Sequence, residues 1–479
     1  MKPTDFQDAV VTVMGLGRYL QGSGVGATKW LMRHGAQTVI TDLQSEEELA
    51  DSIEEVMKWF AKYEKEYPDR TIYKPIFVLG EHRADDFVGA NFVVQNPGVP
   101  RESEFVRIAK ENGVPVLSDI AIFYELYPHP IYAVTGAKGK STTTSMIGEI
   151  LKATDPQTVV AGNIKVSPLE FIDELLTDSE THPVVLELSS WLLESVGDIN
   201  RGPEIALITN LYEEHLNRYD SFEDYVAAKK LIFKNQKPDQ FCVLNYDQDV
   251  VRKIEPEVPS KVVWFSLKDL PAGQQGAFLR DGEFVWRFGE SEEVLMKAEE
   301  LGLTGEHNIA NALAAIAVAR LANVPNEVIV ATMKSFKGIP DRQEIVTDIA
   351  GVTFVNDTTA TAPAAAVAAM KRFGQKGNVV LLAGGADKGL AFDEMAKTIG
   401  ATCKYVVLFE GEATDKLAKA MGKSVPSVRV NSMAEAVEAA TKVAESGDTI
   451  LLSPGCASFG IFKNEFDRGD QFKEVVSKL

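Results

Sequence analysis

The sequence predicts an α/β fold of three domains, each built on a mainly parallel sheet. Short apolar runs rich in β-branched residues alternate with segments of helical periodicity, which is the pattern of βαβ units. The length of 479 residues corresponds to about three domains of ordinary size. Proline-rich breaks interrupt the alternation twice and give the domain limits.

The N-terminal domain is expected to span residues 1–128. Its first elements are a strand, a glycine-rich stretch, a helix and a second strand, at residues 10–14, 15–26, 28–34 and 38–41. This order predicts a Rossmann-like domain. Pro128 and Pro130 cannot continue a helix, and a new strand follows them, so the first boundary is placed there.

The central domain is expected over residues 129–338 and the C-terminal domain over residues 339–479. Central strands are predicted at residues 131–135, 184–188, 205–209 and 241–244, before an alanine-rich helix at 308–321. Gly338 and Pro340 mark the second boundary. C-terminal strands are predicted at residues 352–356, 379–383, 405–409 and 449–452, again in a Rossmann-like pattern.

Composition excludes several functional classes. The net charge of −20 argues against a nucleic-acid-binding surface, since phosphate backbones are bound by clustered Lys and Arg. The three cysteines and six histidines are scattered without metal-site or redox spacing. The N-terminus lacks the apolar core of a signal peptide, and no apolar run approaches the roughly 18 residues of a membrane span. We therefore expect a cytoplasmic protein with no membrane partner.

The strongest motif, Thr-Gly-Ala-Lys-Gly-Lys-Ser-Thr, covers residues 135–142 between a predicted strand and a predicted helix. Backbone N–H groups freed by glycines can surround phosphate oxygens, while Lys140 supplies a cation and Ser141 a hydroxyl for Mg²⁺. Val134 stands where the usual first glycine of a P-loop would be. The alternative is a glycine-rich turn before a helix, but the strand-loop-helix context favours a P-loop. Its predicted ATP contacts are Gly136, Gly139, Lys140, Ser141 and Thr142.

Two residues could complete a Mg-ATP site. Glu187 ends one predicted strand, and His215 follows another, so both are expected at the carboxyl edge of the sheet. Glu187 could be a Mg²⁺ ligand. A helix-capping or structural role is the alternative for each residue alone.

Asn308 and Asn311 stand at i and i+3 on the alanine-rich helix, where their amides could contact an adenine edge. The alternative is that Asn308 is only the helix N-cap, and spacing does not decide between the two. In the first glycine-rich loop, Gly15 and Gly17 with Asp42 suit a nucleotide diphosphate. A turn without a ligand is the alternative there.

Further motifs lie in the same order along all three domains: Asn-Pro-Gly-Val (96–99), Gly-Asn-Ile (162–164), Leu-Glu-Leu-Ser-Ser (186–190), Glu-His (214–215), His-Asn-Ile-Ala-Asn (307–311), Asp-Arg (341–342), Asn-Asp-Thr-Thr-Ala-Thr (356–361), Gly-Gly-Ala-Asp-Lys-Gly (384–389) and Leu-Ser-Pro-Gly-Cys-Ala-Ser (452–458). With the P-loop, this set resembles the Mur ligases, ATP-dependent amino-acid ligases of peptidoglycan synthesis. The pattern is most similar to members that add D-glutamate to UDP-N-acetylmuramoyl-L-alanine.

The resemblance implies a reaction in which ATP converts the acceptor carboxylate to an acyl phosphate, which the glutamate amine then attacks. It also implies site residues by position. ATP would contact Asn308, Asn311, Arg342 and Asp357. The UDP substrate would contact Gly15, Gly17, Asp42, Asn96, Asn163 and Ser189. Glutamate would contact Thr361, Lys388, Ser458 and Phe459. Two Mg²⁺ ions would be held through Ser141, Glu187, His215 and Lys229.

Lys229 is implied by the resemblance to carry a CO₂-derived carbamate, which would convert a cation into an oxygen ligand for Mg²⁺. From the residues alone, Lys229 is interpreted as a solvated helix lysine, because long amines rarely lie inside a protein. The catalytic set implied by the family is Lys140, Glu187, His215 and Lys229.

Several positions differ from the family pattern. Thr359 stands where lysine is frequent, Leu192 where glutamine is frequent, and Lys165 where glycine is frequent. Glu465 occupies the place of an aromatic residue, and the first loop has extra residues at 19–23. Alternatives are another Mur-type ligase, folylpolyglutamate synthase, a non-catalytic P-loop module and an NAD-dependent oxidoreductase. A monomer is expected.

Overall fold

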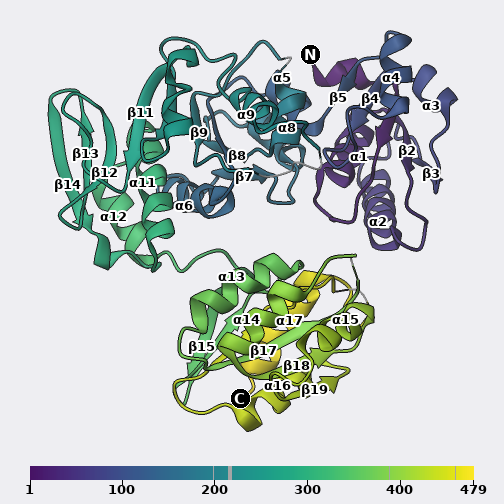
Figure 1. The fold of residues 1–479 in the computed structure, drawn as a ribbon. Helices are drawn as coiled ribbons and strands as arrows, with labels where there is room; N and C mark the ends of the chain where they lie inside the picture. The colour runs from purple at the N-terminus through teal and green to yellow at the C-terminus, as the bar shows by residue number, and fades with distance from the viewer. Residues whose placement is uncertain (198, 214–217, 388, 459) are drawn as a thin grey trace. The chain divides into compact units, whose positions relative to one another are not determined.

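The chain forms two compact units, residues 1–336 and 337–479 (Figure 1). The computed structural model describes residues 1–197, 199–213, 218–387, 389–458 and 460–479. Within those ranges no helix is long and apolar enough to cross a lipid bilayer. The first unit contains two sheets, of five and nine strands, and the second unit contains one six-stranded sheet. The predicted α/β class is confirmed.

The first sheet is parallel, with strand order β3-β2-β1-β4-β5. Its strands are β1 Val10–Met14, β2 Gln37–Asp42, β3 Ile76–Leu79, β4 Phe92–Gln95 and β5 Val116–Leu117. Its helices are α1 Ser23–Arg33, α2 Ala50–Glu66, α3 Ala84–Val88, α4 Glu104–Glu111 and α5 Asp119–Leu126, with the 3-10 helix η1 Pro3–Phe6 before β1. The order reverses at β1, so a ligand crevice is expected at the carboxyl ends of β1 and β4.

Helix α1 starts at Ser23, five residues earlier than the sequence predicts. Its first turn contains Gly24 and Gly26, which depress the helical signal in sequence. A Cβ on Gly26 would lie 2.6 Å from the Cβ of Ser167. The glycine is therefore a packing residue that brings α1 against the segment after β7.

The second sheet has the order β14-β13-β12-β11-β10-β9-β6-β8-β7 and is parallel from β7 to β12. Its parallel strands are β6 Ile131–Thr135, β7 Val159–Gly162, β8 Val184–Glu187, β9 Ile205–Ile208, β10 Phe241–Asn245, β11 Lys261–Ser266 and β12 Gly276–Arg280. Its helices are α6 Lys140–Lys152, η2 Pro168–Glu170, α7 Ile172–Thr177, α8 Ser190–Val196, α9 Phe222–Lys230, α10 Asp249–Arg252, η3 Glu255–Glu257, α11 Glu306–Leu321 and α12 Asn326–Ser335. Strands β8 and β9 are buried throughout, as expected of strands covered on both faces.

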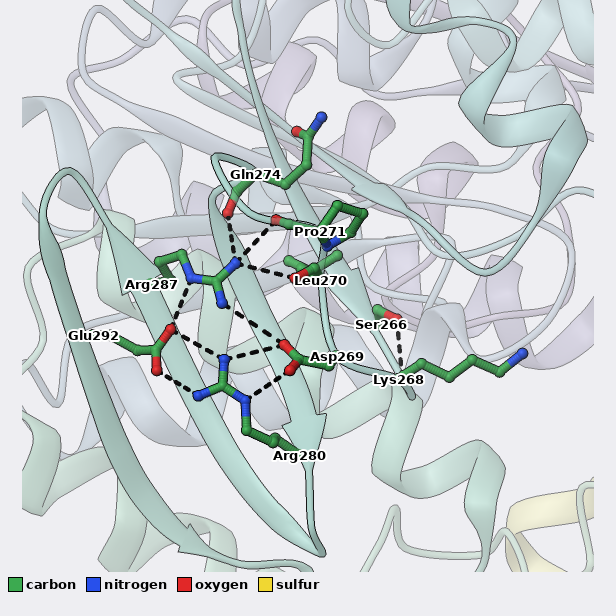
Figure 2. A network of polar contacts seen from close by, with 9 residues as sticks. All are labelled: Ser266, Lys268, Asp269, Leu270, Pro271, Gln274, Arg280, Arg287 and Glu292. Carbon is green, nitrogen blue, oxygen red and sulfur yellow. Dashed lines mark hydrogen bonds and ion pairs between the residues drawn. The ribbon is translucent and has the colours of Figure 1, made fainter.

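An antiparallel extension that the sequence reading missed adds β13 Glu283–Phe288 and β14 Ser291–Lys297 to this sheet, followed by η4 Ala298–Glu300. A network of charged groups joins this extension to the segment between β11 and β12 (Figure 2). Arg280 donates from Nε and Nη2 to Asp269 at 2.8 and 3.1 Å and also pairs with Glu292. Hydrogen bonds from Arg280 and then Arg287 lower the pKa of Glu292 to about 2, so it stays ionised.

Arg287 extends the network to backbone carbonyl groups. Its Nη1 donates to the carbonyl oxygens of Leu270, Pro271 and Gln274 at 3.2, 3.1 and 3.3 Å (Figure 2). These carbonyls belong to the connection between β11 and β12, which are adjacent and parallel without a crossover helix. A guanidinium fork can satisfy several acceptors in a loop that makes few regular backbone hydrogen bonds.

The third sheet has the order β15-β16-β20-β17-β18-β19, with only β15 antiparallel. Its strands are β15 Glu344–Ile349, β16 Val352–Asn356, β17 Val379–Gly384, β18 Cys403–Phe409, β19 Ser427–Val430 and β20 Thr449–Leu452. Its helices are α13 Pro363–Phe373, α14 Asp393–Thr402, α15 Glu412–Met421, α16 Met433–Val443 and α17 Glu465–Val476. Apolar clusters fill both faces of this sheet, which explains why its central strands read as continuous apolar runs.

Candidate functional site

The predicted P-loop connects β6 to α6. Gly136 and Gly139 have φ of +141° and +80°, and each is approached closely by another side chain. A Cβ on Gly136 would lie 2.0 Å from Thr209 Oγ1, and a Cβ on Gly139 would lie 2.3 Å from Asn311 Oδ1. Both positions therefore need glycine for backbone conformation and for space.

The two residues that follow the described end of β9 hold the P-loop through hydrogen bonds. The backbone N–H of Lys138 donates to Asn210 Oδ1 at 2.7 Å, and Asn210 Nδ2 donates back to the Lys138 carbonyl at 2.9 Å. Thr209 Oγ1 donates to the same carbonyl at 2.7 Å. These bonds hold the loop in a fixed shape, which is the preorganisation that phosphate binding needs.

Lys140 and Ser141 begin helix α6 at the end of the loop. Lys140 Nζ donates to the carbonyls of Gly136 and Ala137 at 3.0 and 2.8 Å, so the ammonium lies over the loop. Ser141 and Thr142 are half-buried in the first turn of the helix, at the positive end of its dipole. The arrangement suits a polyphosphate with a bound cation.

Glu187 ends β8 beside this loop and is completely buried. Its Oε1 accepts a hydrogen bond from Asn163 Nδ2 at 2.7 Å, and Oε2 has no hydrogen-bond partner among the described residues. A buried carboxylate oxygen without a donor fits a hard cation such as Mg²⁺. In the described part of the chain, no three His, Cys, Asp or Glu side chains form a metal site by themselves. Such sparse protein ligation is normal for Mg²⁺ held mainly by substrate phosphates and water.

Lys229 is only 2% exposed, so the interpretation as a solvated helix lysine is wrong. Helix α9 brings its Nζ to 3.0 Å from Oγ1 of Thr135, the first residue of the P-loop motif, and to 5.4 Å from the ring centroid of Tyr225. Thr135 Oγ1 in turn donates to the Leu188 carbonyl at 2.5 Å, next to Glu187. Tertiary packing of α9 places this amine inside the site, which a single helical pattern could not reveal.

Helix α11 supplies Asn308 and Asn311, and it packs against α6. The helix begins at Glu306 with Gly305 as N-cap, so the alternative that Asn308 is the cap is wrong. Asn308 Nδ2 donates to the Thr304 carbonyl at 2.8 Å, and Asn311 lies against Gly139 of the P-loop. The structure therefore brings Asn311 to the phosphate loop, with Asn308 one helical turn before it on α11.

The first glycine-rich loop lies at the switch point of the N-terminal sheet. Asp42 Oδ2 accepts from the N–H groups of Leu16 and Gly17 at 2.9 and 3.3 Å, and Oδ1 accepts from Gln44 N–H at 2.9 Å. Asn96 Nδ2 donates to the Gly15 carbonyl at 3.1 Å. Hydrogen bonds thus join four residues that are predicted as substrate contacts: Gly15, Gly17, Asp42 and Asn96.

Two cavities adjoin this loop. The smaller, of about 140 Å³, has Gly17, Asn96 and Asn163 in its wall. The larger, of about 470 Å³, also includes Asn96 and extends along β5 and α8. Ser189, predicted as a substrate neighbour, is the N-cap of α8, where its Oγ accepts from Leu192 N–H at 3.2 Å.

In the C-terminal unit, Asp357 follows β16 and is 3% exposed. Ser453 Oγ donates to its Oδ2 at 2.6 Å and Gln343 N–H donates to its Oδ1 at 3.1 Å. Burial nevertheless raises the pKa of Asp357 to about 7, against the lowering effects of those bonds and of Arg342. Thr361 is half-buried a few residues later, and Ser458 is buried with no partner for Oγ among the described residues.

Two family models match this chain, the Mur ligase middle domain over residues 134–319 and the Mur ligase glutamate ligase domain over residues 341–456. The chain is 41% identical over 478 residues to the UDP-N-acetylmuramoylalanine--D-glutamate ligase of Roseiflexus sp. (strain RS-1), with 98% of each sequence covered. The enzyme of the same name from Caldanaerobacter subterraneus is 36% identical, with 99% of each covered. The chain belongs to the Mur ligase family.

Solved Mur ligase structures share the fold of this chain. The UDP-N-acetylmuramate-alanine ligase of Thermotoga maritima aligns with a TM-score of 0.57 at 19% identity, covering 98% of this chain and 99% of that one. A pseudomurein peptide ligase type C from Methanothermus fervidus aligns at 0.52 and 18% identity, with the same coverage. At this identity the likeness concerns the fold alone.

Three predicted residues of this Mur ligase, His215, Lys388 and Phe459, lie outside the described residues. The others form separate groups within the two units. In the first unit, one group lies at or beside the P-loop and consists of Gly136, Lys140, Glu187, Lys229 and Asn311. In the second unit, Arg342 is exposed and Asp357 buried.

Sequence reasoning missed Arg468 of this Mur ligase. It is completely buried on α17, where Nε donates to Thr358 Oγ1 at 3.0 Å and Nη2 to the Thr358 carbonyl at 2.8 Å. Thr358 Oγ1 donates in turn to the Glu465 carbonyl at 2.6 Å. Arg468 thereby fixes the segment that carries Asp357 and Thr361. A charged residue on an otherwise amphipathic helix gives no sequence signal that it will be buried.

Proposed function

We propose that this Mur ligase adds D-glutamate to UDP-N-acetylmuramoyl-L-alanine at the expense of ATP, in the cytoplasmic synthesis of peptidoglycan precursors. The observation that carries this proposal is the P-loop group. It contains Lys140, the Glu187 oxygen that has no hydrogen-bond partner among the described residues, and the buried amine of Lys229. Full-length relatives named for this reaction support the choice of substrates.

The reaction has two steps. An oxygen of the acceptor carboxylate attacks the γ-phosphorus of ATP, the bond to the β-phosphate oxygen breaks, and ADP leaves. The amine of glutamate then attacks the acyl carbon, phosphate leaves, and the nitrogen loses its proton to give the amide. A free carboxylate is a poor electrophile, so activation must precede amide formation.

The residues around the P-loop mainly position groups and stabilise charge, as expected for phosphoryl transfer. Lys140 would neutralise the β- and γ-phosphates, and the asparagines of α11 would contact adenine. Bound Mg²⁺ would offset the charge that develops on the transferred group, with Ser141 and Glu187 as ligands and His215 as the predicted ligand of a second ion. The predicted roles of Arg342 and Asp357 toward ATP remain predictions.

We further propose that residues 1–128 bind the nucleotide sugar, 129–338 bind ATP and 339–479 bind the amino acid. Asn163 and Ser189 would lie near the acceptor. Thr361, Lys388, Ser458 and Phe459 would bind glutamate. The buried Ser458 Oγ without a described partner is suited to a carboxylate ligand. The protein is expected to act as a monomer.

Carbamylation of Lys229 would allow a residue that is otherwise a buried amine to bind a cation. A carbamate would present anionic oxygens near Glu187, whereas an ammonium would repel Mg²⁺. The Lys229→Ala variant should lose about 100-fold or more in kcat, and ¹³C-bicarbonate should give a carbamate NMR signal in the parent only. Lys230→Ala is the matched control, because Lys230 pairs with Glu257 away from the loop. Parental activity in Lys229→Ala would refute the assignment.

The experiment that tests the proposed function measures phosphate release with ATP, UDP-N-acetylmuramoyl-L-alanine and one amino acid at a time. D-Glu should support turnover, and L-Glu, L-Ala and D-Asp should not. Turnover with a different amino acid would indicate another Mur-type specificity. Steady ATP hydrolysis that no amino acid changes would favour a non-catalytic P-loop module.

A further inference from the structure

The turn that follows β7 holds a lysine in a conformation that favours glycine. Gly162 and Val166 form an antiparallel bridge, in which Gly162 N–H donates to the Val166 carbonyl at 2.8 Å. Lys165 stands before Val166 with φ of +70°. Short turns of this kind usually place glycine at the left-handed position, since a side chain there is strained. A strained non-glycine residue beside a ligand site is a reason to look for a function.

The Lys165 side chain reaches the first glycine-rich loop. Its Nζ lies 4.4 Å from the ring centroid of Tyr19, within the range of a cation–π contact. The backbone joins the same two segments, because Ser167 N–H donates to the Gln21 carbonyl at 2.7 Å. Tyr19 and Lys165, which lie at two places where the sequence is expected to depart from the family pattern, contact each other.

Both residues are in the wall of the 140 Å³ cavity, together with Gly17, Asn96 and Asn163. Its volume is well below the roughly 300–1,000 Å³ typical of a whole ligand site, so it fits one part of a larger ligand. Among the described residues of this wall, Lys165 is the one with a charged side chain.

Two other groups with positive potential near this cavity bind carboxylates. The N–H groups of Leu16 and Gly17 donate to the Asp42 carboxylate. Arg18, which follows them, pairs with Glu48 at 2.8 Å. Lys165 is the cationic side chain that the described wall of the cavity offers to an anionic group.

We propose that Lys165, supported by the ring of Tyr19, binds the diphosphate of the nucleotide-sugar acceptor. The inference rests on the proposed function, because that function supplies the acceptor. Tyr19 holds the flexible lysine stem in place, and the left-handed backbone of Lys165 aims the stem at the first loop. The pair acts as an acceptor-binding element that links the turn after β7 to the loop after β1.

The test compares Lys165→Gly with the parent by calorimetric titration of UDP-N-acetylmuramoyl-L-alanine into the full chain. We expect Kd to rise about tenfold, as for loss of one charge-assisted contact, and the salt dependence of Kd to weaken. The KM for ATP should not change, and Tm should be equal or higher because glycine relaxes the turn. Lys165→Arg should retain binding, and Tyr19→Leu should weaken it more than Tyr19→Phe.

Ala350→Gly is the control for backbone relief, because Ala350 has φ of +53° in an exposed turn of the other unit. It should leave Kd unchanged. Unchanged Kd in Lys165→Gly, or a raised KM for ATP instead, would overturn the inference while parental turnover with D-Glu upholds the proposed function. A parent that neither binds the acceptor nor releases phosphate with any amino acid would overturn both.

Discussion

The two glycine-rich loops of the first unit follow the same local plan but have opposite electrostatics. Each connects the carboxyl end of a central parallel strand to a helix, β1 to α1 and β6 to α6. In the loop after β6, the ammonium of Lys140 lies over the backbone. In the loop after β1, the carboxylate of Asp42 accepts the N–H groups of Leu16 and Gly17. The charge of the side chain that contacts the loop backbone therefore determines how well the loop can bind a polyphosphate: Lys140 favours binding, and Asp42 occupies the N–H groups that a phosphate would need.

The difference explains how an acidic protein handles anionic substrates. With a net charge of −20, bulk potential repels phosphates, so binding depends on local groups. The P-loop has its own cation. The first loop carries an internal anion and depends on Lys165, contributed by a neighbouring turn. Four predictions test this contrast, beginning with the largest expected effect.

Removing the cation of the P-loop should have the greatest effect. Lys140→Ala should lower kcat by about 10²–10³-fold, because it removes a preorganised charge from phosphoryl transfer. Steady-state phosphate release measures the loss. Lys152→Ala, at the other end of α6, is the matched control, since Lys152 pairs with the exposed Glu149 at 3.5 Å. A tenfold loss or less would show that the loop does not depend on Lys140.

Glycine-to-alanine substitutions in the two loops should distinguish the effect of a steric clash from the effect of backbone strain. Gly139→Ala should raise the KM for ATP by about 100-fold, because its Cβ would meet Asn311 Oδ1 at 2.3 Å and displace the loop. Gly17→Ala should have a milder effect on acceptor binding, since the nearest atom is 3.3 Å away. Gly113→Ala measures strain alone, because it has φ of +73° and no neighbour within 4 Å. Equal effects of all three changes would contradict the packing role of Gly139.

Removing the Asp42 carboxylate from the first loop should lower the free energy of unfolding. Asp42→Ala leaves three backbone N–H groups without their acceptor, which should lower the free energy of unfolding by about 3 kcal/mol. Urea unfolding followed by fluorescence measures the change, and Asp42→Asn should lie between variant and parent. Unchanged stability would mean that Asp42 serves a ligand and not the loop.

Asp357 accepts a hydrogen bond from one described backbone N–H group, whereas Asp42 accepts three, and the protonation of Asp357 should make the free energy of unfolding depend on pH. The pKa of Asp357 is about 7 when folded against an ordinary value of 3.8, so the folded state binds this proton more tightly. Its contribution to stability is therefore present at low pH and falls as pH rises between about 4 and 7. The slope should be about 1 kcal/mol per pH unit, and Asp357→Asn should remove it. A parental slope that persists in Asp357→Asn would exclude Asp357 as its source.

Sequence predicted the parallel cores well because their strands are buried on both faces and read as short apolar runs. The predicted strand at residues 449–452 coincides with β20, and that at 352–356 with β16. The antiparallel strand β14 was missed because Ser291–Lys297 has three polar residues followed by three apolar ones, without the alternation typical of a strand, and is largely exposed. Its pairing with β13 depends on cross-strand contacts, which a single segment does not encode.

Within the site, chemistry carried by a local motif could be predicted, and chemistry that depends on burial could not. The P-loop residues follow from strand, glycine and helix in one segment. Lys229 and Arg468 are buried charges, and a charged residue on a helix is far more often solvated. The contact between Tyr19 and Lys165 joins two sheets of the first unit, so no local pattern could indicate it.

The central claim is that the P-loop directs the γ-phosphoryl group of ATP to the carboxylate of an acceptor whose diphosphate is bound beside the first loop. Transfer of ¹⁸O from UDP-N-acetylmuramoyl-L-alanine labelled in its carboxylate tests this claim most directly. With D-glutamate and ATP, mass spectrometry should find one ¹⁸O atom in each phosphate released, because the attacking carboxylate oxygen leaves with the phosphate. Released phosphate without the label would show that water, not the carboxylate, receives the phosphoryl group, and would contradict the account.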